Sequence, residues 1–126
     1  MIIVRNGDKL ERGTVRARLR FDFKGTARQT RLFFGNKSPQ EAAAENRQRQ
    51  LFALEHVPIQ GITVTELSGD GEIYTVVDPI TGEDVAYAPV ELTVEADSIE
   101  DLIRFAFREE FRKIDILEPK EMLLTH

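Results

Sequence analysis

The stretch that decides the fold is Thr14-Val15-Arg16-Ala17-Arg18-Leu19-Arg20-Phe21-Asp22-Phe23. Apolar side chains occupy every odd position from 15 to 23, and polar side chains occupy the even positions. Successive side chains of a β-strand point to opposite faces, so this alternation predicts a strand with one buried and one polar face. Three of the polar positions are arginines, so the polar face carries a row of positive charge.

The residues that follow suggest a partner for this strand. Lys24-Gly25-Thr26 has the composition of a turn, and residues 27–34 resume as a strand that ends in Leu32-Phe33-Phe34. We therefore expect strands 14–23 and 27–34 to pair as a β-hairpin. In that pairing Arg31 and Phe33 extend the face that holds Arg16, Arg18 and Arg20.

Two helices are marked by their N-terminal caps. Ser38 and Glu41 form a capping box with a proline between them, which predicts a helix from residue 38 to the breaks at 58 and 61. Ser98 with Asp101 predicts a second helix to about residue 109. Its expected apolar stripe consists of Ile99, Leu102, Ile103, Ala106 and Phe107.

The remaining segments read as strands and turns. Strands are predicted at 62–67, 72–77, 85–95 and 111–117, and residues 120–126 read as a loose tail or a short turn. Pro89 inside the third of these strands predicts a bulge or an edge position, because proline donates no backbone hydrogen bond.

This order of elements predicts an α+β fold, a two-layer sandwich of one antiparallel sheet and two helices. Residues 32–67 and 90–117 each run strand, helix, strand, which is the split βαβ pattern of ferredoxin-like folds with an extra N-terminal hairpin strand. Residues 91–119 also resemble the end of the small domain that follows WYL domains in bacterial transcription regulators, without the Trp-Tyr-Leu signature. A plainer α+β meander is the alternative.

Composition bounds the class of protein. A chain of 126 residues fits one domain, and we take 1–126 as a single unit. The absence of cysteine excludes disulfides, thiolate metal sites and cysteine nucleophiles. The sequence has no apolar run of membrane-spanning length and only a short one at its start, so we expect a cytoplasmic protein without membrane contact.

Charge is distributed unevenly along the chain. Residues 1–35 hold nine Lys/Arg and three Asp/Glu, whereas residues 36–126 hold eight and nineteen, which gives +6 and −11. The basic part is centred on the arginine row, which has three interpretations. It is a solvated face paired with Glu66, Glu91 or Glu95; it contacts a protein partner or a second copy of the chain; or it binds nucleic acid.

Other candidate sites are weaker. Lys37 and Ser38 lie at the expected N-terminus of the first helix, where an anion can bind, and a turn with a cap is the plainer interpretation. His56 has no nucleophile or orienting carboxylate near it in the sequence. We assign no catalytic residue, metal ligand or cofactor.

Together these observations favour a small non-catalytic interaction or assembly domain, expected to be a homodimer. Its contacts would come from the arginine-striped N-terminal hairpin, namely Arg16, Arg18, Arg20, Arg31 and Phe33. A nucleic-acid-binding module that uses the same strand face is one alternative. An enzyme or small-anion-binding protein is the other.

Overall fold

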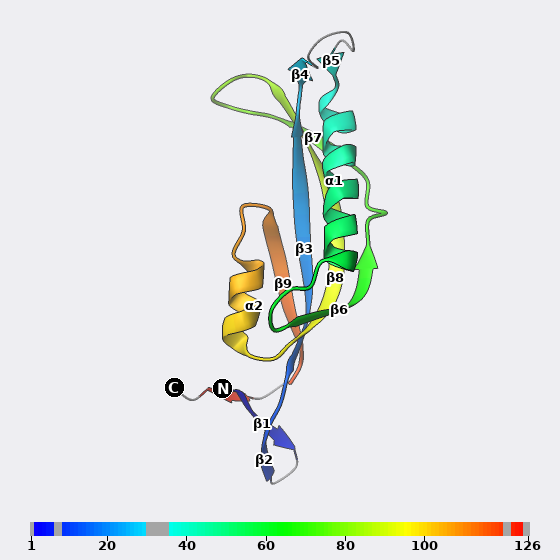
Figure 1. Cartoon of the computed structure of the whole chain (residues 1–126). Coiled ribbons are helices and arrows are strands. Elements are labelled where there is room, and N and C mark those ends of the chain that lie inside the picture. Colours follow the sequence, from blue (N-terminus) through cyan, green and yellow to red (C-terminus); the bar gives the residue numbers. More distant parts are fainter. Residues whose placement is uncertain (1, 7–8, 30–35, 120–121, 125–126) are drawn as a thin grey trace.

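The computed structural model describes residues 2–6, 9–29, 36–119 and 122–124 (Figure 1). It is an α+β fold in which two helices pack on a five-stranded antiparallel sheet. In chain order the elements are β1 (Ile2–Asn6), β2 (Lys9–Arg12), β3 (Val15–Thr26), β4 (Arg28–Gln29), β5 (Asn36–Lys37), α1 (Pro39–His56), β6 (Ile62–Ser68), β7 (Tyr74–Val77), β8 (Asp84–Ala96), α2 (Ile99–Ala106), β9 (Phe111–Glu118) and β10 (Met122–Leu124).

The strand that decides the fold, β3, lies in the middle of the main sheet. β8 pairs with it along its whole length, and β9 pairs with its other edge from Arg16 to Phe21. β6 and β7 both pair with β8, so the sheet order is β6-β8-β3-β9 with β7 joined to β8. Every pairing in this sheet is antiparallel.

The predicted hairpin between 14–23 and 27–34 is wrong, because β8 and β9 occupy both edges of β3 from Arg16 to Phe21. The expected turn at Lys24-Gly25-Thr26 is instead the end of β3. A glycine here serves close packing: a Cβ on Gly25 would lie 2.1 Å from the backbone nitrogen of Ala43 in α1. Of the expected second strand, residues 28–29 form β4 and pair with β5, and residues 30–35 lie outside the described part of the chain.

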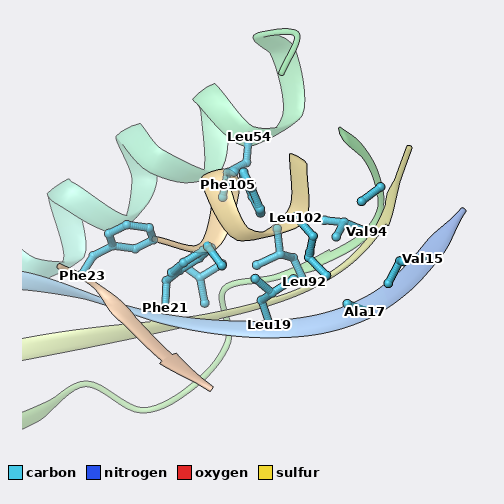
Figure 2. Close-up of a cluster of buried hydrophobic side chains, with 13 residues drawn as sticks. Val15, Ala17, Leu19, Phe21, Phe23, Leu54, Leu92, Val94, Leu102 and Phe105 are labelled. Atoms are coloured by element: carbon cyan, nitrogen blue, oxygen red, sulfur yellow. The ribbon is translucent and has the colours of Figure 1, made fainter. Parts of the chain in front are cut away.

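Both helices cover the same face of the sheet (Figure 2). The odd-numbered side chains of β3 face them and pack with Leu54 of α1 and with Leu102 and Phe105 of α2. The predicted caps are confirmed: the Ser38 and Ser98 hydroxyls each accept a hydrogen bond from a backbone N–H three residues on. The hydrophobic core therefore lies between one helical layer and one face of the sheet.

The apolar stripe expected for the second helix is partly wrong. Ile103 and Phe107 are 58% and 88% exposed, whereas Phe105, left out of the stripe, is 7% exposed. Phe105 packs edge-on against Phe21 with ring centroids 5.7 Å apart. The helix ends at Ala106, so Phe107 no longer follows the helical period.

Residues 122–124 of the expected loose tail form β10, which pairs with β1 in a small sheet of order β10-β1-β2. This second sheet was not expected from the sequence. In the described part of the chain, neither helix is both long and apolar enough to cross a membrane.

Candidate functional site

The arginine row lies on the face of the main sheet that neither helix covers, which we call the uncovered face. Cross-strand register defines it: beside Arg16 lie Glu95 of β8 and Glu118 of β9. Beside Arg18 are Thr93 and Asp115, and beside Arg20 are Glu91 and Lys113. A cationic column on β3 therefore runs between two columns that carry mostly carboxylates.

Arg16 takes part in two exposed ion pairs. Its guanidinium lies 3.5 Å from a carboxylate oxygen of Glu66 and 3.8 Å from one of Glu118. The side chains of these glutamates are 65% and 69% exposed, so each pair is solvated and individually weak. Glu66, one of the three carboxylates named for a paired, solvated face, thus lies beside Arg16.

Arg20 forms the strongest polar contact of the row. Its Nε and Nη2 donate to the two carboxylate oxygens of Asp22 at 2.8 and 3.2 Å. The carboxylate is only 2% exposed, so the two hydrogen bonds from Arg20 replace the water that would otherwise solvate it. The hydrogen bond to Asp22 raises the pKa of Arg20 above its ordinary value.

Two further side chains converge on Asp22. The Tyr74 hydroxyl donates to its Oδ2 at 2.5 Å, and Nε of Arg112 lies 3.8 Å away. Burial, followed by the hydrogen bond and charge of Asp22, raises the pKa of Tyr74. Sequence reasoning placed Asp22 correctly on the polar face but gave it no role. The one feature that could have indicated a role is that Asp22 is an acidic residue within a row of cations.

Arg18, at the centre of the row, is exposed. Within the residues that the structure describes, no carboxylate oxygen lies within ion-pair distance of it. Its cross-strand neighbour Thr93 is buried, and Asp115 on the other side pairs with Lys113 at 3.6 Å. Arg18 is therefore the arginine of this row that is best placed to meet another molecule.

Of the other predicted site residues, Lys37 and Ser38 lie at the start of α1, away from the row. Arg31 and Phe33 lie outside the described residues. Lys37 contacts Glu45 through an ion pair of 2.5 Å. The Glu41 backbone N–H donates to the Ser38 hydroxyl, which in turn donates to the Glu41 carboxylate. The N-terminus of α1 therefore already has carboxylates of the same helix next to both candidate anion-binding residues.

A groove lies at the C-terminal end of β3, beyond the point where β9 begins opposite Phe21. Its volume is about 910 Å³, and it is bounded by the β3 edge, by α1 between Ala42 and Arg49, and by the turn into β9. Representative residues of these three walls are Thr26, Asn46 and Glu109. Sequence reasoning missed this groove, because it depends on where β9 begins relative to β3.

Comparison with known proteins adds no assignment to these surfaces. No family model matches the chain, including any for the family that residues 91–119 resemble, and no curated protein or solved structure matches it.

Proposed function

We propose that this chain is a non-catalytic interaction domain that forms a homodimer through its uncovered face. The observation that carries the proposal is the charge pattern: one cationic column, Arg16 to Arg20, between columns that hold Glu91, Glu95 and Asp115. A two-fold interface uses the same patch on both subunits. If two such faces pack with β3 of one copy over β8 or β9 of the other, the arginines of one copy lie over carboxylates of the other.

The same pattern disfavours nucleic acid as the partner. Polyanion binding requires cations that are free to replace condensed counterions. Arg16 and Arg20 are already engaged by carboxylates, and a phosphate backbone along β3 would also pass Glu95 and Asp115. A protein surface that carries both signs of charge complements the uncovered face better than a uniformly negative polymer does.

We also propose that the main sheet and its helices form a ferredoxin-like split βαβ sandwich. In support, α1 lies between β3 and β6 in the chain, α2 lies between β8 and β9, and the sheet order is β6-β8-β3-β9. This fold leaves one sheet face without helices, which is the face that the dimer proposal uses.

Light scattering coupled to size exclusion tests the dimer. The chain at about 50 μM in low salt is expected to run as a dimer that dissociates as salt rises, because its contacts are ionic. Arg18→Glu is expected to raise the dimer dissociation constant about tenfold. The matched control is Arg49→Glu, the same charge reversal on the exposed face of α1.

Mixing two variants shows whether opposite charges meet between copies. Glu95→Arg alone is expected to weaken the dimer, and an equimolar mixture with Arg18→Glu is expected to recover a mixed dimer. A wild-type chain that remains monomeric at about 50 μM in low salt would remove the proposal, as would equal effects of the Arg18 and Arg49 variants.

A further inference from the structure

One edge of β3 loses its partner before the strand ends. β9 pairs with β3 only as far as Phe21, and the backbone N–H of Asp22 donates to the Glu110 carbonyl at 2.9 Å. From Phe23 to Thr26, the one partner that β3 has among the described residues is β8 on its other side. Figure 1 shows β3 continuing well past β9, with α1 alongside. We call residues 23–26 on this side the free edge.

The backbone of the free edge points into the groove at alternate residues. Asp22 directs its N–H toward β9, and strand geometry repeats every two residues, so Lys24 and Thr26 direct their backbone groups the same way. The Lys24 carbonyl accepts a hydrogen bond from the Asn46 side-chain amide at 3.0 Å. A side chain of α1 thus stands where the N–H of another strand would otherwise donate.

The groove is lined by four cations and four carboxylates, and a positive remainder arises only because Arg108, just outside the lining, pairs with Glu110. Lys37 pairs with Glu45, Arg112 lies near Asp22, and Glu110 lies 3.7 Å from Arg108. Among the described lining residues, this leaves the exposed cations Lys24 and Arg49 against Glu109. Lys24 lies on the strand wall and Arg49 on the helix wall.

We propose that the groove binds an extended acidic peptide of a partner protein, which adds a strand to the free edge of β3. Strand addition uses main-chain hydrogen bonds for affinity and alternate side chains for specificity. The peptide's main chain pairs with Thr26 and with the N–H of Lys24, whose carbonyl stays bonded to Asn46. Its carboxylates meet Lys24 on one side of the strand or Arg49 on the other. The groove volume of about 910 Å³ suits several residues of such a segment.

Fluorescence anisotropy tests this with a labelled eight-residue peptide of alternating glutamate and threonine. Saturable binding is expected, about tenfold or more weaker for the peptide in which lysine replaces glutamate. N-methylation of alternate residues is expected to abolish binding in one register and spare it in the other, because only one set of N–H groups faces β3. In NMR spectra, the Lys24 and Thr26 amides are expected to shift on titration.

Two charge reversals separate this groove from the uncovered face. Arg49→Glu is expected to weaken peptide binding about tenfold, and Arg18→Glu is the control that leaves it unchanged. Circular dichroism and thermal unfolding check that both variants fold. No saturable binding up to about 1 mM would overturn the proposal, as would equal affinity for the lysine peptide, tolerance of methylation in both registers, or shifts confined to other residues.

Discussion

The Tyr74 hydroxyl donates a hydrogen bond of 2.5 Å to Oδ2 of Asp22, and so connects β7 to the central strand across the sheet. Tyr74 lies opposite Tyr87 of β8 in the register, and their rings stack with centroids 5.3 Å apart. A buried carboxylate on the otherwise exposed side of β3 is thus held by one tyrosine and two arginines.

Replacing Asp22 by asparagine is expected to lower the free energy of unfolding by about 2 kcal/mol, because the arginines lose their buried anion. Tyr74→Phe removes only the hydroxyl, and its expected cost is about 1 kcal/mol. Urea unfolding followed by circular dichroism measures both. If Asp22→Asn costs no more than Tyr74→Phe, the carboxylate's charge contributes nothing to stability.

Alkaline pH is expected to destabilise the protein in part through Tyr74. Burial and Asp22 raise its folded pKa above the unfolded value of about 10, so the folded state holds the proton more tightly. This contribution is complete below pH about 10 and is lost as pH rises through the folded pKa. Urea unfolding at pH 8 and at higher pH should show a smaller loss in Tyr74→Phe than in the wild type.

Arg16 and Arg20, at the two ends of the row, are expected to differ in their effect on stability. Arg16→Met should change the free energy of unfolding by less than about 0.5 kcal/mol, because Glu66 and Glu118 remain in water. Arg20→Met should cost about 1–2 kcal/mol, because it removes the bidentate partner of buried Asp22. Equal costs for the two variants would contradict this interpretation.

Gly25 is expected to tolerate no side chain. In Gly25→Ala the Cβ would approach the backbone nitrogen of Ala43 to 2.1 Å, and helix and strand must separate, with an expected cost of about 3 kcal/mol or more. The control is Gly82→Ala, where the Cβ meets nothing within 4 Å and only the φ of +74° opposes it, at about 1 kcal/mol. Thermal unfolding ranks the two variants.

Local patterns predicted most elements correctly, because helix caps and strand alternation depend on neighbouring residues. Ser38 and Ser98 marked both helices, and the alternation around Leu19 marked β3. Pro89, expected at an edge or bulge, lies opposite Asp22 between the stretches of β8 that pair with β7 and with β6. The strand partners were less predictable: a turn-like Lys24-Gly25-Thr26 suggested a hairpin, while the glycine actually accommodates α1.

The candidate site was predicted only in part. Arg16, Arg18 and Arg20 share the polar face that the alternation required. Of the two acidic partners of Arg16, Glu66 was among those named and Glu118 was not. The contacts of Asp22 with Tyr74 and Arg112 depend on where β7 and β9 lie relative to β3, and the groove near Asn46 depends on where β9 begins. Such long-range contacts leave no periodic signal in the sequence.

The central position of β3 also has a consequence for synthesis of the chain. β3 is complete at Thr26, but β9 begins only at Phe111, so at about 5–20 residues per second roughly 4–17 s separate the strand from one of its neighbours. Throughout that interval Leu19, Phe21 and Phe23 lack part of the hydrophobic core that buries them in the folded protein. Interleaved charges protect such apolar stretches from aggregation. The charged residues Arg18, Arg20 and Asp22 alternate with these side chains, so we expect them to limit aggregation of the nascent chain during that interval.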